Sequence, residues 1–173
     1  HARAVPKEGG GTRLANMFAA YDDLSDALKQ RLEGLIALHL YGNRDAHIPG
    51  EWNSELKTDA QRARVPMCEH PIVRPHPITG QKALYAVSGT SRGIVGMPED
   101  EALDLLGQLK AHALQAKYTV THNYEVGDVM TWDTSSTLHA AEPLVTEYSE
   151  AHRRIMWRIS VRGRPRLLRQ AAS

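Results

Sequence analysis

The spacing of the apolar residues changes along this chain, and the change limits the folds that it can adopt. Two stretches before residue 114 carry apolar residues three or four positions apart, as an amphipathic helix does. From Tyr118 onward the spacing is two, in Tyr118–Tyr124, Asp128–Trp132 and Arg154–Val161, which is typical of strands. Helices therefore precede a block of strands without regular alternation. The pattern predicts an α+β or mainly β fold, with a sheet or barrel at its centre.

Each of the two predicted helices has a start signal. Ser25 can cap the first, which we expect to run to Gly42-Asn43, and Pro98 opens the second ahead of three acidic residues. The expected apolar faces are Leu24, Leu28, Leu32, Leu35 and Ile36 on the first helix, and Ala102, Leu105, Leu106, Leu109 and Ala113 on the second.

The remaining segments are predicted from their glycines and prolines. Three glycines in Lys7–Thr12 indicate a tight turn, and His76–Gln81 indicates another. Lys82–Val87 has the pattern of a short strand. Arg44–Pro77 is polar and rich in proline, so we expect a long excursion of the kind that often forms a lid or binds substrate.

Composition excludes several classes of protein. Apolar residues make up 42% of the 173 residues, which is too many for a disordered chain. The single cysteine, Cys68, excludes a disulfide scaffold and a cysteine-rich zinc module. The same lone cysteine makes a reducing, cytoplasmic location the expected one. No run of 18 apolar residues exists, so we expect no membrane partner. The length favours one domain over residues 1–173.

Positive charge is concentrated at the end of the chain. Residues 151–173 contain seven arginines and no acidic residue, although the net charge of the whole chain is only +1. Such a segment can bind nucleic acid or an acidic partner, or it can be a solvated strand and tail. Because no aromatic ladder or binding motif accompanies it, we expect no nucleic-acid partner.

The last predicted strand places Arg154 and Arg158 on one face. That face is either exposed to solvent, as in ordinary alternation, or turned into a cavity where the arginines bind carboxylates bidentately. Four residues of strand separate the two backbone positions by about 13 Å. Two anions, or the two ends of an assembled complex, therefore suit this pair better than one small carboxylate.

Histidine is the other candidate for site chemistry. The nine histidines contain no HExxH motif and no zinc-finger spacing. We expect His39 and His112 on helix faces, and His70 and His76 in turns, because each of the latter two precedes a proline. His139 differs from these, since it follows Trp132 and a small polar turn at the end of a predicted strand.

Four blocks along the chain match the motifs of one family in that family's order. They read PKEGGGTRLANM at 6–17, HPIVRPHPITGQKALY at 70–85, GDVMTWDTSSTLH at 127–139 and RRIMWR at 153–158. Together they resemble the TauD/TfdA family of Fe(II)- and 2-oxoglutarate-dependent dioxygenases. The resemblance implies a double-stranded β-helix (jelly-roll, cupin-like) core with flanking helices. It also implies Fe(II), 2-oxoglutarate and O₂, with hydroxylation of a small organic substrate and release of succinate and CO₂.

The resemblance implies roles for individual residues. His139 matches a ligand of the iron-binding triad, and Arg154 and Thr12 match residues that bind the distal carboxylate of 2-oxoglutarate. Arg158 matches an arginine at the substrate end, which implies an anionic substrate, and Trp132 matches a tryptophan packed by the metal; we place both with the substrate.

The motif for the other two iron ligands is not found in this chain. The family carries it as H-x-(D/E) before the glycine turn, but His1 is followed by Ala2 and Arg3. We therefore expect an N-terminally incomplete dioxygenase domain that binds iron weakly by itself. The alternative is a non-catalytic jelly-roll that binds a small anion. The resemblance is also compatible with a homo-oligomer.

Overall fold

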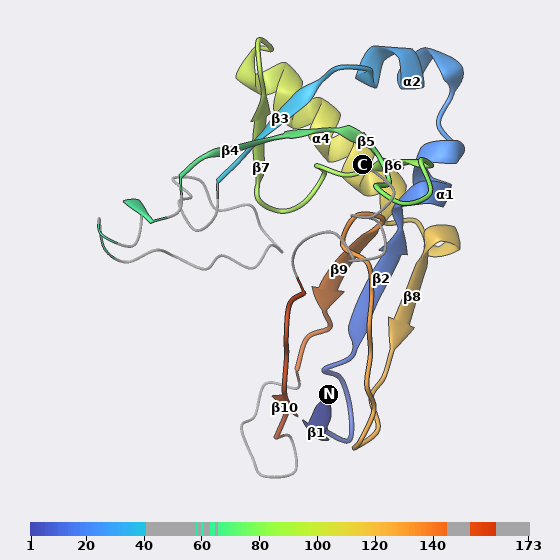
Figure 1. Ribbon diagram of the computed structural model, residues 1–173, viewed down its shortest axis with the longest axis vertical. Coiled ribbons are helices and arrows are strands. Elements are labelled where there is room, and N and C mark those ends of the chain that lie inside the picture. The colour runs from blue at the N-terminus through green and yellow to red at the C-terminus, as the bar shows by residue number, and fades with distance from the viewer. Residues whose placement is uncertain (41–57, 59, 61–62, 65, 145–152, 162–173) are drawn as a thin grey trace, which may run out of the picture. The chain divides into compact units, whose positions relative to one another are not determined.

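The computed structural model describes residues 1–40, 58, 60, 63–64, 66–144 and 153–161, which fold into two compact units. The smaller unit contains His1–Gly11, Asn123–Thr131 and the described residues from Glu142 onward. The larger unit contains Thr12–His122 and Trp132–Ala141. Helices and strands occur together, as predicted (Figure 1). The jelly-roll and the single domain over residues 1–173 stay predictions.

Three antiparallel sheets are seen among the described residues of the larger unit. In the first, which Figure 1 shows as three neighbouring arrows, the order is β8 (Thr119–His122), β2 (Thr12–Asn16), β9 (Thr137–Ala141). In the others the order is β4 (Cys68–Pro71), β3 (Ile36–His39), β7 (Ser91–Ile94), and β5 (Val73–Pro75) paired with β6 (Lys82–Leu84).

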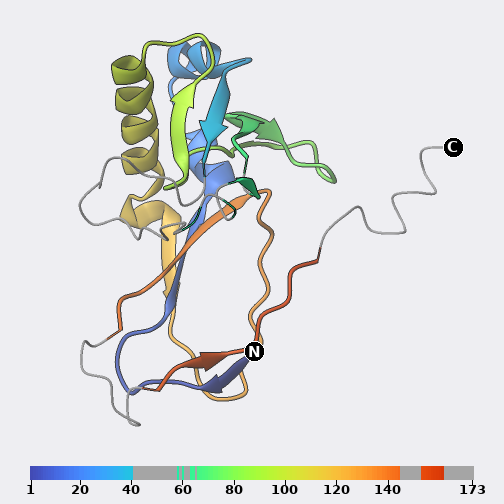
Figure 2. The same cartoon turned by 90° about the vertical axis from the view of Figure 1, so that its left-hand side faces the viewer.

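The α-helices formed by the described residues of this unit begin at side-chain caps or at a proline. They are α1 (Met17–Asp22), α2 (Asp26–Leu32) and α4 (Glu99–Ala113), and α4 is followed by the short 3₁₀ helix η1 (Ala116–Tyr118), which has no side-chain cap. The Ser25 hydroxyl accepts a hydrogen bond from Leu28 N at 3.3 Å, which confirms the predicted cap. All five residues of the apolar face predicted for α4 are buried, and α4 packs against β7 (Figure 2).

The first predicted helix ends ten residues earlier than expected, at Leu32 instead of Gly42. Gly34 adopts φ = +75°, a left-handed conformation that stops the helix. The predicted stripe residue Ile36 and the predicted helix-face residue His39 instead belong to β3, which pairs with β4 on one side and β7 on the other. Two neighbouring strands satisfy this backbone on both edges, so tertiary pairing overrides the helical spacing.

Several other boundaries also differ from the prediction. The expected excursion contains β4 and β5, so His70 is a strand residue, while residues 41–57, 59, 61–62 and 65 lie outside the described residues. The strands predicted at Tyr118–Tyr124 and Lys82–Val87 are shorter, and Asp128–Trp132 forms no strand. The turn at His76–Gln81 is confirmed, since His76 and Gln81 pair backbone to backbone at 2.8 Å.

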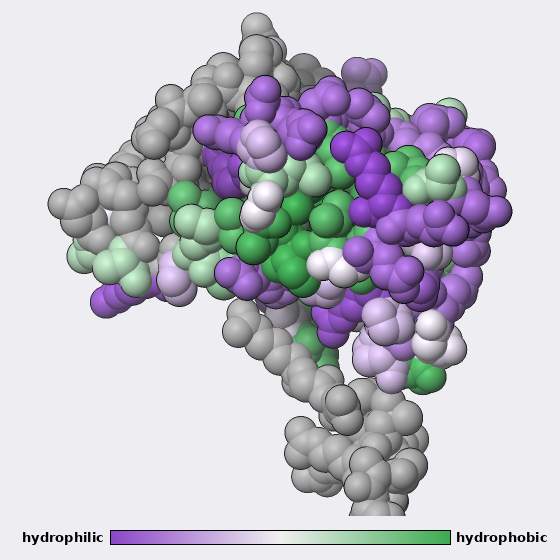
Figure 3. Space-filling view, turned by 90° about the horizontal axis from the view of Figure 1, so that it is seen from above, coloured by the Kyte–Doolittle hydropathy of each residue, from purple (hydrophilic) through white to green (hydrophobic). Residues whose placement is uncertain are grey.

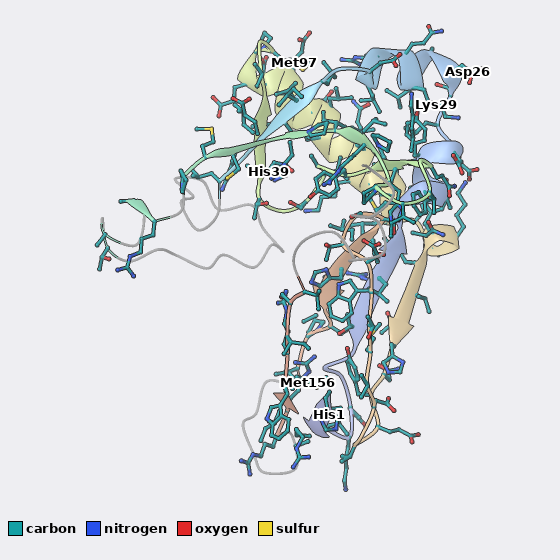
Figure 4. All side chains as sticks on the ribbon, viewed as in Figure 1. His1, Asp26, Lys29, His39, Met97 and Met156 are labelled. Atoms are coloured by element: carbon teal, nitrogen blue, oxygen red, sulfur yellow. The ribbon has the colours of Figure 1, made fainter. Side chains whose placement is uncertain are left out.

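In the smaller unit, β1 (Ala2–Ala4) pairs with β10 (Ile155–Met156), so His1 and Met156 lie close together in Figure 4. The long strand predicted at Arg154–Val161 is a strand only at these two residues. Beyond it, Trp157, Ile159 and Val161 are 61%, 90% and 91% exposed, so the apolar face of the predicted strand is not buried by the described residues. The arginine-rich residues from 162 onward lie outside them.

The hydrophobic core belongs to the larger unit. Its largest fully buried side chains are Leu32, Ile72, Leu84, Val87, Leu105 and Leu109. At the surface, hydrophobic residues gather in a patch bordered by hydrophilic ones on the face seen in Figure 3. None of the helices formed by the described residues has the length and apolar character needed to span a membrane.

Candidate functional site

The glycine turn of the smaller unit encloses part of an arginine side chain. Gly9 and Gly10 adopt φ of +73° and +67°, and the Gly10 N–H donates to Pro143 O at 3.1 Å. A Cβ added to Gly10 would meet Leu144 Cδ2 at 2.9 Å and Arg154 Cδ at 3.0 Å. Gly10 is therefore required both by its backbone conformation and by the close approach of Arg154.

Arg154 is oriented by this turn. Its Nε donates to the carbonyl oxygen of Gly10 at 2.7 Å, and its guanidinium lies 5.8 Å from the centroid of the Tyr124 ring. Tyr124 and Val5–Gly10 help to line a cavity of about 310 Å³ in the same unit. Because Nε is engaged, the guanidinium has its two terminal nitrogens left to bind a carboxylate bidentately.

Arg158 does not lie in the strand that the sequence predicts. It is exposed and lies beyond β10, in a stretch that forms no strand. The predicted continuous strand that would carry Arg154 and Arg158 on one face therefore does not form among the described residues.

In the larger unit, Thr12 and His139 lie on one face of the β8-β2-β9 sheet. Leu14 is paired directly with His139, and Thr12, two residues before Leu14, is paired with Ala141. Directly paired residues share a face, and so do residues two apart on one strand. Thr12 and His139 are consequently diagonal neighbours, with Thr12 6% exposed and His139 exposed.

Trp132 lies beside His139. The two rings are 4.9 Å apart between centroids and are tilted by 51°. Of the five residues singled out from the sequence, the structure thus brings together Thr12, Trp132 and His139 in the larger unit. Arg154 and Arg158 belong to the smaller unit.

The sequence interpretation missed a polar pair that joins this segment to a distant turn, formed by the buried His76 and the half-exposed Asp133. His76, expected as a turn residue, is indeed in the turn, but it is 8% exposed and its Nε2 lies 2.9 Å from Asp133 Oδ2. The hydrogen bond from His76 holds the pKa of the Asp133 carboxyl below its usual value, and the bond from Ser135 N acts in the same direction. The local pattern carried no signal for a partner of His76, because the two residues are 57 positions apart.

His139 fits one position of a metal site but not a whole site. An imidazole is a suitable ligand for iron, and its exposed ring leaves access for further ligands. Among the described residues, no three His, Cys, Asp or Glu side chains gather so that they could hold a metal ion. Of the described residues, the family motifs match only His139 to a ligand of the iron that the resemblance implies.

Comparison with known proteins identifies the family. The family model described as "Taurine catabolism dioxygenase TauD, TfdA family" matches residues 1–160. An alpha-ketoglutarate-dependent 2,4-dichlorophenoxyacetate dioxygenase of Burkholderia sp. (strain RASC) is 34% identical over 163 residues, which cover 94% of this chain and 52% of the relative. An alkylsulfatase of Acinetobacter baylyi is also 34% identical, covering 92% of this chain and 50% of the relative.

A solved structure agrees with these relatives. The crystal structure of AAD-2 in complex with Mn(II) and N-oxalylglycine is 28% identical, with a TM-score of 0.73 over 89% of this chain and 57% of that chain. The chain spans about half the length of the curated relatives that it matches. The family model covers nearly all of the sequence, and the four sequence motifs lie within the matched residues. The chain therefore belongs to the TauD/TfdA dioxygenase family.

Proposed function

We propose that the full-length protein is a dioxygenase that uses Fe(II), 2-oxoglutarate and O₂ to hydroxylate a small anionic organic substrate. One oxygen atom enters a C–H bond of the substrate, and the other enters the succinate that forms from 2-oxoglutarate with loss of CO₂. Relatives named as alpha-ketoglutarate-dependent dioxygenases support the reaction class.

The observation that carries this proposal is the arrangement of Arg154. Its Nε–H is held by the Gly10 carbonyl at 2.7 Å, so the terminal nitrogens form a fixed two-pronged donor. Gly10, which accepts this hydrogen bond, and Tyr124 help to line a cavity of about 310 Å³, a volume at the small end of the range for small-molecule sites. We assign Arg154 to the distal carboxylate of 2-oxoglutarate, and Thr12 to the same co-substrate through its hydroxyl, the latter on the family motif alone.

His139 is assigned as one iron ligand. The metal, when bound, supplies the redox chemistry that activates O₂. The protein's own contribution is to hold the imidazole on an edge strand of a three-stranded sheet and to pack Trp132 against it, with ring centroids 4.9 Å apart. Trp132 is therefore well placed to line the substrate side of this ligand.

Arg158 is assigned to the anionic group of the substrate. Its guanidinium is exposed, so an anion can reach it without displacing protein groups. A carboxylate, a sulfonate and a sulfate ester are the candidate groups, because each accepts paired hydrogen bonds from a guanidinium.

Succinate release by the full-length protein tests the proposal. The protein is incubated with Fe(II), O₂, 2-oxoglutarate and a panel of small carboxylates, sulfonates and sulfate esters. We expect Arg154→Ala to raise the KM for 2-oxoglutarate strongly, since loss of one member of a desolvated charge pair costs about 2–5 kcal/mol. Arg154→Lys should recover only part of this loss, because an ammonium cannot form the two-pronged contact.

Arg31→Ala is the matched control, since Arg31 is an exposed arginine on α2. It should leave the KM unchanged. An unchanged KM in Arg154→Ala would contradict the assignment of Arg154. A full-length protein that binds 2-oxoglutarate but releases no succinate with any substrate of the panel would be a small-anion binding protein instead.

A further inference from the structure

His76 joins two segments of the larger unit that are far apart in the sequence. It lies at the start of the turn His76–Gln81, and it is 8% exposed. Its Nε2 contacts Asp133 Oδ2 at 2.9 Å across 57 residues of sequence. Asp133 directly follows Trp132, whose ring packs on His139. One buried side chain is thus connected, through one carboxylate, to the segment that carries the proposed metal ligand.

The contacts of the second ring nitrogen fix the direction of this hydrogen bond. Nδ1 of His76 lies 3.4 Å from Ile78 N and 3.2 Å from Thr79 N. Backbone N–H groups can only donate, so Nδ1 is an acceptor and the proton of the neutral ring is on Nε2. Nε2–H therefore donates to Asp133, and the turn itself selects the tautomer that can do so.

Asp133 also forms hydrogen bonds within the turn that precedes β9. Its second oxygen, Oδ1, accepts from Ser135 N at 2.7 Å, and its backbone carbonyl accepts from Ser136 N at 3.3 Å. Ser136 O in turn accepts from Met17 N at 3.0 Å. The turn therefore depends on both oxygens of one carboxylate, and this turn carries Trp132 back beside the strand of His139.

We propose that His76 is a positioning residue, which through Asp133 holds Trp132 against His139 and so orients the imidazole assigned to the metal. The assignment of His139 as a ligand rests on the proposed function, but the coupling of His76 to Trp132 does not. His76 contacts neither substrate nor metal in this scheme.

Three substitutions in the full-length protein separate this role from simple stabilisation. His76→Asn removes the Nε2 donor but keeps an acceptor near the position of Nδ1, and His76→Gln keeps a donor near Nε2. His112→Asn is the control, because His112 Nε2 also donates to a distant oxygen of the same unit, the carbonyl of Ala20, at 2.8 Å. It removes a comparable bond that does not involve Asp133.

The first measurement is made without metal. The indole N–H resonance of Trp132 is compared in ¹H–¹⁵N spectra of the wild type and the three variants, after assignment by Trp132→Phe. We expect it to shift in His76→Asn, to return toward the wild-type position in His76→Gln, and to stay in place in His112→Asn. The same shift in His112→Asn as in His76→Asn, or no shift in His76→Asn, would overturn the coupling.

The second measurement is the Kd for Mn(II), which serves as an air-stable probe. Loss of groups behind a metal ligand weakens binding about 10–100-fold, and we expect about tenfold in His76→Asn and no change in His112→Asn. An equal Kd in His76→Asn and the wild type would overturn the metal-positioning role. If the wild type itself binds no Mn(II), the proposed function fails, whereas the indole resonance still decides whether His76 positions Trp132.

Discussion

Arg154 in the smaller unit is held by a backbone carbonyl, whereas the turn before His139 in the larger unit is held by side chains as well as by the backbone. The partner of Arg154 is the carbonyl of Gly10, and a carbonyl is available at every residue. The turn requires glycine at position 10, because this residue has positive φ and because a Cβ would come too close to Arg154. Behind His139, by contrast, the contacts are those of an imidazole, a carboxylate and an indole ring.

This difference shows two ways in which a residue type can be required. At Gly10 the requirement is steric. Every other residue type carries a Cβ, so all of them are disfavoured for the same reason. At His76 and Asp133 the requirement is chemical, because a donor must meet an acceptor, and a substitution that retains the donor retains part of the contact. Among the described residues, glycines alone have positive φ, so the segment Trp132–His139 owes its shape to partners instead of backbone strain.

The largest effect is expected where a proposed metal ligand is removed. His139→Ala in the full-length protein should abolish Fe(II)-dependent succinate release, because it removes an imidazole that we assign to the metal. His139 is an exposed residue on an edge strand, so its loss should leave the fold intact. Activity and thermal unfolding are measured on the same sample. Full turnover in this variant would remove the metal assignment.

Gly10→Ala tests the steric side of the comparison. We expect the free energy of unfolding to fall by about 1–2 kcal/mol, because alanine resists positive φ. The KM for 2-oxoglutarate should rise as well, since the new Cβ would lie 3.0 Å from Arg154 Cδ and displace the guanidinium.

The control for Gly10 is Gly34→Ala. Gly34 has φ = +75° but no atom within 4 Å of an added Cβ, so the substitution brings the backbone strain without the clash. Denaturant unfolding should show a loss of stability in both variants, larger in Gly10→Ala because of the added clash, and only Gly10→Ala should change the KM. A higher KM in both would mean that lost stability, and not the position of Arg154, controls co-substrate binding.

Thr12→Val should have a smaller effect than any change to Arg154. Valine matches the shape of threonine at this buried strand position and removes one hydroxyl. Loss of a single hydrogen bond costs about 1 kcal/mol, so the KM for 2-oxoglutarate should rise about fivefold. Thr121→Val on β8 serves as the strand control and should leave the KM unchanged. Equal KM values for Thr12→Val and the wild type would remove Thr12 from the co-substrate site.

The smallest effect is expected from the charge of Asp133. Its folded pKa lies below the usual value of 3.8 because of the bonds from His76 and Ser135. A carboxyl with a lowered folded pKa adds stability above its unfolded pKa and loses it as the pH falls toward the folded pKa. As the pH falls below about 5, the wild type should therefore lose more unfolding free energy than Asp133→Asn does. Parallel pH profiles would show that the pair contributes little through charge.

Local features of the sequence predicted local structure well. The apolar face of α4 is buried residue for residue, and Ser25 caps α2, because helical spacing and capping depend on residues within a few positions of each other. The glycines of Lys7–Thr12 were expected to form a turn, and two of them have positive φ. The family motifs also named Thr12, Trp132, His139, Arg154 and Arg158 as site residues, whose roles stay predictions.

The tertiary structure decided what local spacing could not. Leu35 and Ile36 continue a helical stripe in the sequence, yet Ile36–His39 is a strand, because β4 and β7 offer hydrogen-bond partners on both of its edges. The strand predicted at Arg154–Val161 shrinks to the two residues that β1 pairs with. His76 and Asp133, 57 residues apart, meet only after the chain has folded. The sequence by itself determined helices, caps and turns, whose energies are local. The tertiary structure selected the strand partners and the partner of His76, because these interactions join residues that are distant in the sequence.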